Sequence, residues 1–222
     1  MSGATVVIDT FRAFSTAAYL VASGVGRIVL AESLDEARSR AATIPNSILC
    51  GEEGGRRPED FDLGNSPVEV GAHPKLAGRT VVMRTSSGTR AIVRALRSGA
   101  DPVYAASLVV AGSTASAVRC STRVTIVASG LGGASIADED EETADLISDR
   151  ILGRADDAQR IDRIQSGEGA ARLRSSAWID PADLTYCLDV DRFQFALRAG
   201  FDGGVATLYA VHSKGSGSTP QK

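Results

Sequence analysis

Four short polar runs in this chain carry side chains that suit a hard cation and a phosphate group. They are Asp9–Ala13, Phe61–Pro67, Thr85–Ala91 and the acidic pair Glu139–Asp140. Each run lies where a strand is expected to end, which is where open α/β sheets gather their ligand sites. Together they supply carboxylates, hydroxyls, an amide, glycine-rich backbone and two arginines. This mixture predicts a site that binds a cation and an anionic substrate.

Carboxylates provide the candidate ligands of the cation. Asp9 follows a short apolar run, so its side chain should project at the carboxyl end of a strand. Mg²⁺ prefers oxygen ligands in octahedral geometry, keeps several waters and typically takes one or two carboxylates. The candidate ligands are Asp9, Glu52, Asp62, Glu139 and Asp140. The alternative is that each caps a helix or is a solvated charge, and the acidic run at 138–142 also suits a helix N-terminus.

The run Thr85–Thr89 joins an expected strand to an expected helix and predicts an anion site. Gly88 allows the backbone to approach a ligand closely, and N–H groups at the start of a helix attract negative charge. Side-chain donors are added by Thr85, Ser86, Ser87, Thr89 and Arg90. The alternative is an ordinary capped turn between a strand and a helix.

Three further residues complete the candidate catalytic group with Asp9 and Arg90. The guanidinium of Arg12 would clamp a phosphate, carboxylate or sulfonate in bidentate fashion. Asn65 and Ser66 would orient the substrate or a metal-bound water. The alternatives are a surface arginine paired with a nearby acid, and a Gly-Asn-Ser-Pro turn that forms without any ligand.

Other phosphatase chemistries find little support in the residues. Cys50 and Arg56 have the spacing of a cysteine phosphatase loop, but Glu52 and Glu53 would repel phosphate and raise the pKa of the thiol. Position 11 is Phe, so Asp9 does not begin an Asp-x-Asp phosphotransferase motif. Neither histidine lies in an Arg-His-Gly context, which argues against a histidine phosphoenzyme.

The segments that must position these runs alternate between short apolar runs and helix-like stretches. Strands are expected at 5–9, 27–31, 47–50, 80–83, 103–105, 124–128 and 205–211. Helices are expected at 14–22, from 33 onward, at 89–97, 109–118 and 141–152, and mainly helix follows residue 154. Residues 51–66 form a loop long enough to favour a functional role. The alternation predicts an α/β fold whose mixed, largely parallel sheet is flanked by helices in three layers.

Length and composition limit the classes of protein. We expect one domain over residues 1–212, with two subdomains meeting near residue 150 as the alternative, and a disordered tail at 213–222. The net charge of -3 gives no reason to expect a nucleic-acid surface, and no apolar run is long enough to span a membrane. No signal peptide pattern is present, and 3 widely separated cysteines fit a reduced, cytoplasmic protein. Trp178 is expected in the core or at an interface.

In order and spacing, the polar runs resemble the 2-phosphosulfolactate phosphatase family, the magnesium-dependent acid phosphatases of coenzyme M synthesis. The family pattern reads roughly D-V-L-R-A, then G-E-R-x-G, G-F-D-L-G-N-S-P, T-T-N-G-T-x-A and E-D-x-x-x-A-G. The matching segments are Asp9–Thr16, Gly51–Gly55, Phe61–Pro67, Thr85–Ala91 and Glu139–Ala144. Phe61–Pro67 matches without change, and the resemblance covers residues 5–210.

Four positions depart from the family pattern. Phe14 stands in place of a small or hydroxyl residue, and Glu53 replaces an arginine. Ser87 replaces an asparagine, and Asp145 stands where a glycine is expected. These changes leave the expected fold in place, but they bear on the substrate because a fold alone does not transfer a function.

The resemblance implies a cytoplasmic, Mg²⁺-dependent phosphomonoesterase that converts (2R)-2-phospho-3-sulfolactate to 3-sulfolactate and phosphate. Mg²⁺ held by Asp9 and the late acidic pair would polarise the phosphoryl group, while Thr85–Thr89 and Arg90 would neutralise transition-state charge. Arg12 would hold the acid groups of the substrate. A homodimer is expected on the resemblance alone. The alternatives are an enzyme of the same fold acting on another small phosphorylated acid, and a non-catalytic metabolite-binding protein.

Overall fold

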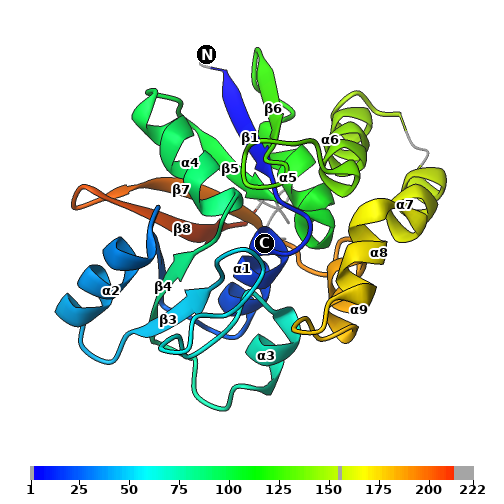
Figure 1. Ribbon diagram of the computed structural model, residues 1–222. Coiled ribbons are helices and arrows are strands. Elements are labelled where there is room, and N and C mark those ends of the chain that lie inside the picture. Colours follow the sequence, from blue (N-terminus) through cyan, green and yellow to red (C-terminus); the bar gives the residue numbers. More distant parts are fainter. Residues whose placement is uncertain (1–2, 155–156, 213–222) are drawn as a thin grey trace, which may run out of the picture.

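A sheet of eight strands organises the part of the chain that the computed structural model describes, residues 3–154 and 157–212 (Figure 1). The strands are β1 (Ala4–Ile8), β2 (Arg27–Leu30), β3 (Ile48–Gly51), β4 (Thr80–Arg84), β5 (Val103–Ala106), β6 (Val124–Ala128), β7 (Ala196–Asp202) and β8 (Val205–Val211). The helices are α1 (Ala13–Ala22), α2 (Leu34–Thr43), α3 (Pro67–Ala72), α4 (Gly88–Arg97), η1 (Leu108–Val110), α5 (Ala111–Val118), α6 (Asp138–Ile151), α7 (Asp157–Ser166), α8 (Glu168–Ser175) and α9 (Ala182–Cys187). The strand order is β3-β4-β2-β8-β7-β5-β1-β6.

Two parallel triplets of strands form the two ends of this sheet. β3, β4 and β2 pair in parallel at one end, and β5, β1 and β6 do so at the other. The antiparallel hairpin of β7 and β8 lies between the triplets and pairs with β5 and β2. Because three successive pairings are antiparallel, the strands of the two triplets run in opposite directions. The sheet is mixed and mostly parallel, as predicted.

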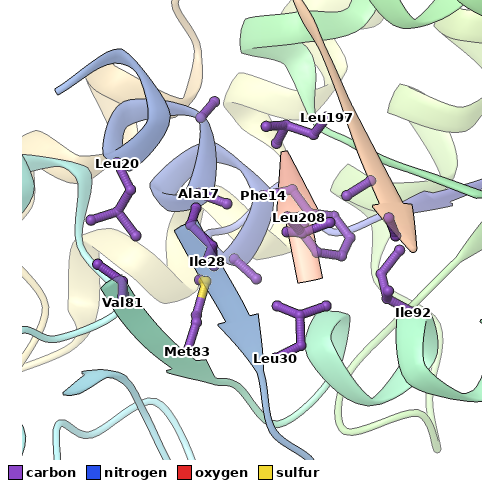
Figure 2. Close-up of a cluster of buried hydrophobic side chains, with 14 of the residues drawn as sticks. Phe14, Ala17, Leu20, Ile28, Leu30, Val81, Met83, Ile92, Leu197 and Leu208 are labelled. Carbon is purple, nitrogen blue, oxygen red and sulfur yellow. The ribbon is translucent and has the colours of Figure 1, made fainter. Parts of the chain in front are cut away.

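Helices cover both faces of the sheet, which confirms the predicted α/β fold. On one face, α1 and α4 pack on the central strands, and their core contains Phe14, Ile28, Leu30, Met83 and Ile92 (Figure 2). On the other face, α2 packs on β2 and β4, α5 packs on β5 and α6 packs on β1, while α7 packs on α6. Each fully buried side chain of this size stabilises the fold by about 1.5–3 kcal/mol.

Most predicted strands and helices are present, and two elements differ. β7 lies where helix was expected. Its sequence Ala-Leu-Arg-Ala-Gly-Phe-Asp has no β-branched residue, and its pairing with β5 and β8 determines its structure. α3 was not predicted. It begins after Ser66, whose Oγ accepts a hydrogen bond from the Glu69 N–H at 3.2 Å, and Pro67 suits its first position.

The helices after residue 154 form a separate group beside the sheet. α7, α8 and α9 lie together at one side of the molecule in Figure 1, while α2 lies at the other. The tail expected at 213–222 lies outside the described residues. Within 3–154 and 157–212, no helix is long and apolar enough to cross a bilayer.

Candidate active site

A cavity of about 770 Å³ lies where β1, β3, β4 and β6 end. Residues from all four polar runs line it together with Glu52, and the candidate residues in its lining are Asp9, Arg12, Glu52, Asn65, Ser86, Ser87, Arg90, Glu139 and Asp140. The other candidate residues lie outside its lining, namely Asp62, Ser66, Thr85, Gly88 and Thr89. The ends of β1 and β4 meet here, although the two triplets of strands run in opposite directions. The helices that follow these strands, α1 and α4, contact each other on one face of the sheet.

Asp9 ends β1, and its buried carboxylate lies at the start of two helices. Its Oδ1 accepts a hydrogen bond from the Ala13 N–H of α1 at 3.0 Å. Its Oδ2 lies against Gly88 of α4, where a Cβ atom would come within 2.7 Å of it. Burial raises the pKa of Asp9 to about 7, and the negative charges of Glu52 and Glu139 add to this effect. The buried charge of this carboxylate is therefore unfavourable unless the group is protonated or binds a cation.

Asp140 connects three elements at the cavity. Its Oδ1 accepts the Thr10 N–H at 2.8 Å, and its Oδ2 accepts the Gly130 N–H at 3.0 Å and the Ser129 hydroxyl at 3.2 Å. These donors come from the ends of β1 and β6, so Asp140 ties both strands to the first turn of α6. Burial, together with the charge of Asp9, raises the pKa of Asp140 to about 7.

Glu139 has one carboxylate oxygen without a partner. Its Oε1 accepts a hydrogen bond from Arg172 at 3.0 Å, whereas its Oε2 is buried and makes no hydrogen bond. A Cβ atom at Gly169 would lie 2.1 Å from this Oε2, so the glycine leaves room for the carboxylate. Burial raises the pKa of Glu139 to about 8, and the neighbouring carboxyl of Asp138 adds to this effect. An unpaired buried carboxylate oxygen is costly, and a bound cation would remove this cost.

Glu52 holds two loops of the cavity together. Its oxygens accept hydrogen bonds from the Ser86 N–H at 2.5 Å, the Gly55 N–H at 2.6 Å and the Ser86 hydroxyl at 3.1 Å. In the same region, the Ser87 hydroxyl accepts the Gly132 N–H at 2.8 Å. The loops after β3, β4 and β6 are thus bonded to one another around the cavity.

The predicted turn into α4 is present, but its two threonines bond to each other. Thr89 Oγ1 accepts the Thr85 N–H at 2.9 Å, and Thr85 Oγ1 accepts the Thr89 N–H at 3.2 Å. Both side chains are buried. These hydroxyls stabilise the turn, while Ser86, Ser87 and Arg90 from the same run line the cavity.

Within the described residues, the arginines that line the cavity are Arg12, Arg90 and Arg172. Arg12 is buried and pairs with Asp183 of α9 at 2.6 Å. Arg172 of α8 pairs with Glu139. Arg90 has no ion-pair partner in the part of the chain that the structure describes. Of these three arginines, it is therefore the one whose charge is not already balanced by a carboxylate.

Two candidate residues have structural partners instead. Asp62 is exposed, and its Oδ2 accepts the Leu49 N–H at 2.8 Å, which fixes the segment that runs beside β3. Ser66 caps α3, and its hydroxyl donates to Asp183 at 2.7 Å. Cys50 is buried, does not line the cavity, and has a pKa raised by burial, which removes support for the cysteine phosphatase alternative.

Three residues of the C-terminal third that line or support the cavity were not predicted as site residues from the sequence. They are Arg172, Trp178 and Asp183. Trp178, expected in the core or at an interface, is 54% exposed and lines the cavity. No spacing pattern marks these residues, because only the packing of α8 and α9 brings them to the strand ends.

The donors with free capacity fit a hard cation. Among the described residues, no group of three or more His, Cys, Asp or Glu side chains is placed to hold a metal ion. Glu139 Oε2 and Asn65 Oδ1 are, however, buried oxygens without hydrogen-bond partners, and both residues line the cavity with Asp9. Mg²⁺ typically takes one or two carboxylates and completes its shell with water, so the chemistry of these oxygens is compatible with such a cation.

Comparison with known proteins shows the family of the chain. A family model described as 2-phosphosulpholactate phosphatase matches residues 1–198. The chain belongs to the 2-phosphosulfolactate phosphatase family. A protein of Deinococcus radiodurans named probable 2-phosphosulfolactate phosphatase is 37% identical over 180 residues, which are 77% of this chain and 74% of that protein. One of Bacillus subtilis with the same name is 30% identical over 214 residues, 93% of this chain and 91% of that protein.

The predicted membership of the 2-phosphosulfolactate phosphatase family is thus confirmed, and so is its class, a phosphoric monoester hydrolase. The residues that depart from the family pattern have local partners. Phe14 of α1 is buried in the core, and Glu53 pairs with Arg84 at 3.2 Å. Ser87 accepts its hydrogen bond from Gly132. Asp145 pairs with Arg160 at 3.0 Å. These side chains are compatible with the family fold, and of the four only Ser87 lines the cavity.

Proposed function

We propose that this protein hydrolyses a small phosphorylated organic acid, with 2-phospho-3-sulfolactate as the first candidate. The names of the two relatives support this substrate. The observation that carries the proposal is that Asp9, an unpaired oxygen of Glu139 and the unpaired guanidinium of Arg90 share one cavity of the described structure. The carboxylates can bind a metal ion, and the unpaired guanidinium beside them can bind the phosphate group of an ester.

In the proposed reaction, water attacks phosphorus and the bond from phosphorus to the substrate oxygen breaks. Asp9 Oδ2 accepts a proton from the attacking water and afterwards releases it to solvent, and the leaving oxygen takes up one proton from solvent to become an alcohol. Burial raises the pKa of this carboxyl to about 7 when no cation is bound, and a cation held by Asp9 would lower it. An alternative in which Asp9 attacks phosphorus itself would give a phosphorylated aspartate.

The arginines would bind the anionic groups of the substrate. Arg90, with the hydroxyls of Ser86 and Ser87, would contact the phosphoryl oxygens and stabilise the charge that develops on them. Arg12 would bind the carboxylate or sulfonate, and its pairing with Asp183 fixes its orientation before substrate arrives.

Mg²⁺ is the proposed cofactor. When bound, it would polarise the phosphoryl group and lower the pKa of a coordinated water. Asp9 and Glu139 would hold it, with Asn65 Oδ1 as a neutral donor. Asp140 and Glu52 accept several N–H hydrogen bonds, so we assign them the role of holding the surrounding loops in place.

The test is phosphate release from 2-phospho-3-sulfolactate with Mg²⁺ and with EDTA. Glu139→Gln should lower turnover at limiting Mg²⁺, while Asp62→Asn, an acid outside the cavity, is the matched control and should behave as wild type. Metal-dependent release supports the proposal. A folded protein that releases no phosphate rejects it, and a strong preference for another phosphorylated acid rejects only the substrate. The expected homodimer and cytoplasmic location stay predictions, and light scattering in solution tests the first.

A further inference from the structure

The cavity has an apolar side that the first candidate substrate does not require. Besides the charged groups, its lining includes Phe11, Leu131, Leu173, Trp178 and Ile179. Cavities of roughly 300–1,000 Å³ enclose drug-sized ligands, and this one measures about 770 Å³. 2-Phospho-3-sulfolactate is a short acid with charged groups along its whole length, so it leaves this apolar surface without a partner.

Trp178 gives the apolar side a flat and firmly placed surface. It lies in the segment between α8 and α9, lines the cavity and is 54% exposed. Arg56, from the loop after β3, lies with its guanidinium carbon 4.3 Å from the ring centroid. Gly55 lies beside the indole nitrogen, where a Cβ atom would be 3.5 Å away. A ring held by a cation–π contact loses little freedom when a ligand packs on its accessible part.

We propose that the cavity accepts phosphate esters of 2-hydroxy acids that end in an apolar, preferably aromatic, group packed against Trp178. This inference rests on the proposed phosphatase function, which places the phosphoryl group near Asp9 and Arg90. The reaction is unchanged: the oxygen of water bonds to phosphorus, the ester bond breaks, and the leaving oxygen gains a proton. Only the group attached to the acid differs.

Two esters that differ by one phenyl ring test the inference, namely 2-phospho-3-phenyllactate and 2-phospholactate. The chain has 1 tryptophan, so its fluorescence reports on Trp178 alone. The phenyl ester should change this emission and bind roughly tenfold more tightly than 2-phospholactate, the order expected for an aromatic contact with its apolar burial. If the esters are hydrolysed, their kcat/KM values are compared. If they are bound without release of phosphate, the Kd values measured by calorimetry are compared.

Three variants separate this contact from general effects. Trp178→Ala should remove the preference for the phenyl ester, and Trp178→Phe should retain most of it. Phe201→Ala, which removes an exposed aromatic ring of β7 outside the cavity, should leave the preference unchanged.

Equal binding of the two esters, or an emission that does not respond to the phenyl ester, overturns the inference even if phosphate is released. If neither ester nor phosphosulfolactate is hydrolysed, the phosphatase proposal fails, whereas a calorimetric preference abolished by Trp178→Ala still supports the apolar site.

Discussion

The guanidinium of Arg12 and the carboxylate of Asp183 form an ion pair of 2.6 Å in which both side chains are buried. Arg12 belongs to the first polar run and Asp183 to the last helix of the chain, α9. The other oxygen of Asp183 accepts hydrogen bonds from the Ser66 hydroxyl at 2.7 Å and the Val68 N–H at 3.1 Å. Asp183 therefore fixes a cavity-lining arginine and the start of α3 without lining the cavity itself.

Asp183→Asn should destabilise the protein by about 3 kcal/mol, because it leaves a buried guanidinium without its counter-charge. Asp189→Asn is the matched control, since Asp189 pairs with Arg192 at 3.7 Å on the surface, and it should change stability by less than about 0.5 kcal/mol. Urea unfolding measures both. Equal effects of the two substitutions would show that the buried pair contributes no more than a surface pair.

Asp9→Asn should lower kcat by about 100-fold or more, because it removes the group proposed to accept the proton of water. The same change should stabilise the metal-free protein above neutral pH, since a buried negative charge beside Glu52 and Glu139 is removed. Steady-state kinetics and melting temperature in EDTA measure the two effects. A variant with near-native kcat and an intact fold contradicts the assigned role.

Arg90→Met should lower kcat/KM by about 100-fold, because the guanidinium is proposed to stabilise charge on the phosphoryl group. Arg94→Met, an exposed arginine one turn further along α4, serves as the control and should leave kcat/KM unchanged. Phosphate-release kinetics at several substrate concentrations distinguish the two. A similar small effect of both changes would argue that general positive charge, and not Arg90 itself, assists the reaction.

Gly88→Ala should reduce activity strongly. The added Cβ would lie 2.7 Å from Asp9 Oδ2 and 3.0 Å from the side chains of Ala13 and Phe14, so the carboxylate must move. Gly71→Ala is the matched control in α3, where the nearest atom to a Cβ belongs to Tyr186 at 3.8 Å, and it should be neutral or stabilise by about 0.5–1 kcal/mol. Parallel activity and melting measurements test this. Native activity in the Gly88 variant would mean that the position of Asp9 is not critical.

The metal-free protein should lose stability as pH rises from about 4 through 8. Burial raises the pKa of Asp9 and of Asp140 to about 7 and that of Glu139 to about 8, above the values near 4 of an unfolded chain. The folded state therefore binds these protons more tightly than the unfolded state does. The resulting contribution to the free energy of unfolding is complete below the pKa values of the unfolded chain and is lost as pH rises past the pKa values of the folded protein.

Melting curves in EDTA between pH 5 and pH 9 measure this dependence. Added Mg²⁺ should raise the melting temperature more at pH 8 than at pH 5.5, since protons compete with the cation for the same oxygens. Glu139→Gln should make the melting temperature depend less on pH at the upper end of this pH range. A metal-free protein that becomes more stable across this window would contradict the assignment of raised pKa values.

The strand ends could be predicted because their signals are local. Asp9 and Ser86 belong to short runs that follow apolar segments, Asn65 lies in the long loop after the third expected strand, and all three line the cavity. The roles of individual side chains could not be predicted in the same way. Thr85 and Thr89 have the hydroxyls that a phosphate site needs, but they bond to each other within the turn. Sequence alone does not decide whether a donor bonds to a ligand or to its own backbone.

Long-range packing explains the rest of what the sequence does not reveal. β7 has weak strand propensity and is a strand because β5 and β8 offer pairing on both sides. Arg172, Trp178 and Asp183 reach the site only because α8 packs on α6 and α9 packs on α3. Such residues carry no periodic pattern of their own.

The central position of β7 and β8 also sets the order in which the protein can form during synthesis. The two parallel triplets have no direct pairing with each other, and the strands that join them are residues 196–211. A ribosome releases the N-terminal part of a chain first. Until those last strands emerge, the nascent chain holds two open sheet edges, on β2 and β5, which are surfaces that other chains can pair with. We expect chaperone protection of this chain to end only once that hairpin is inserted.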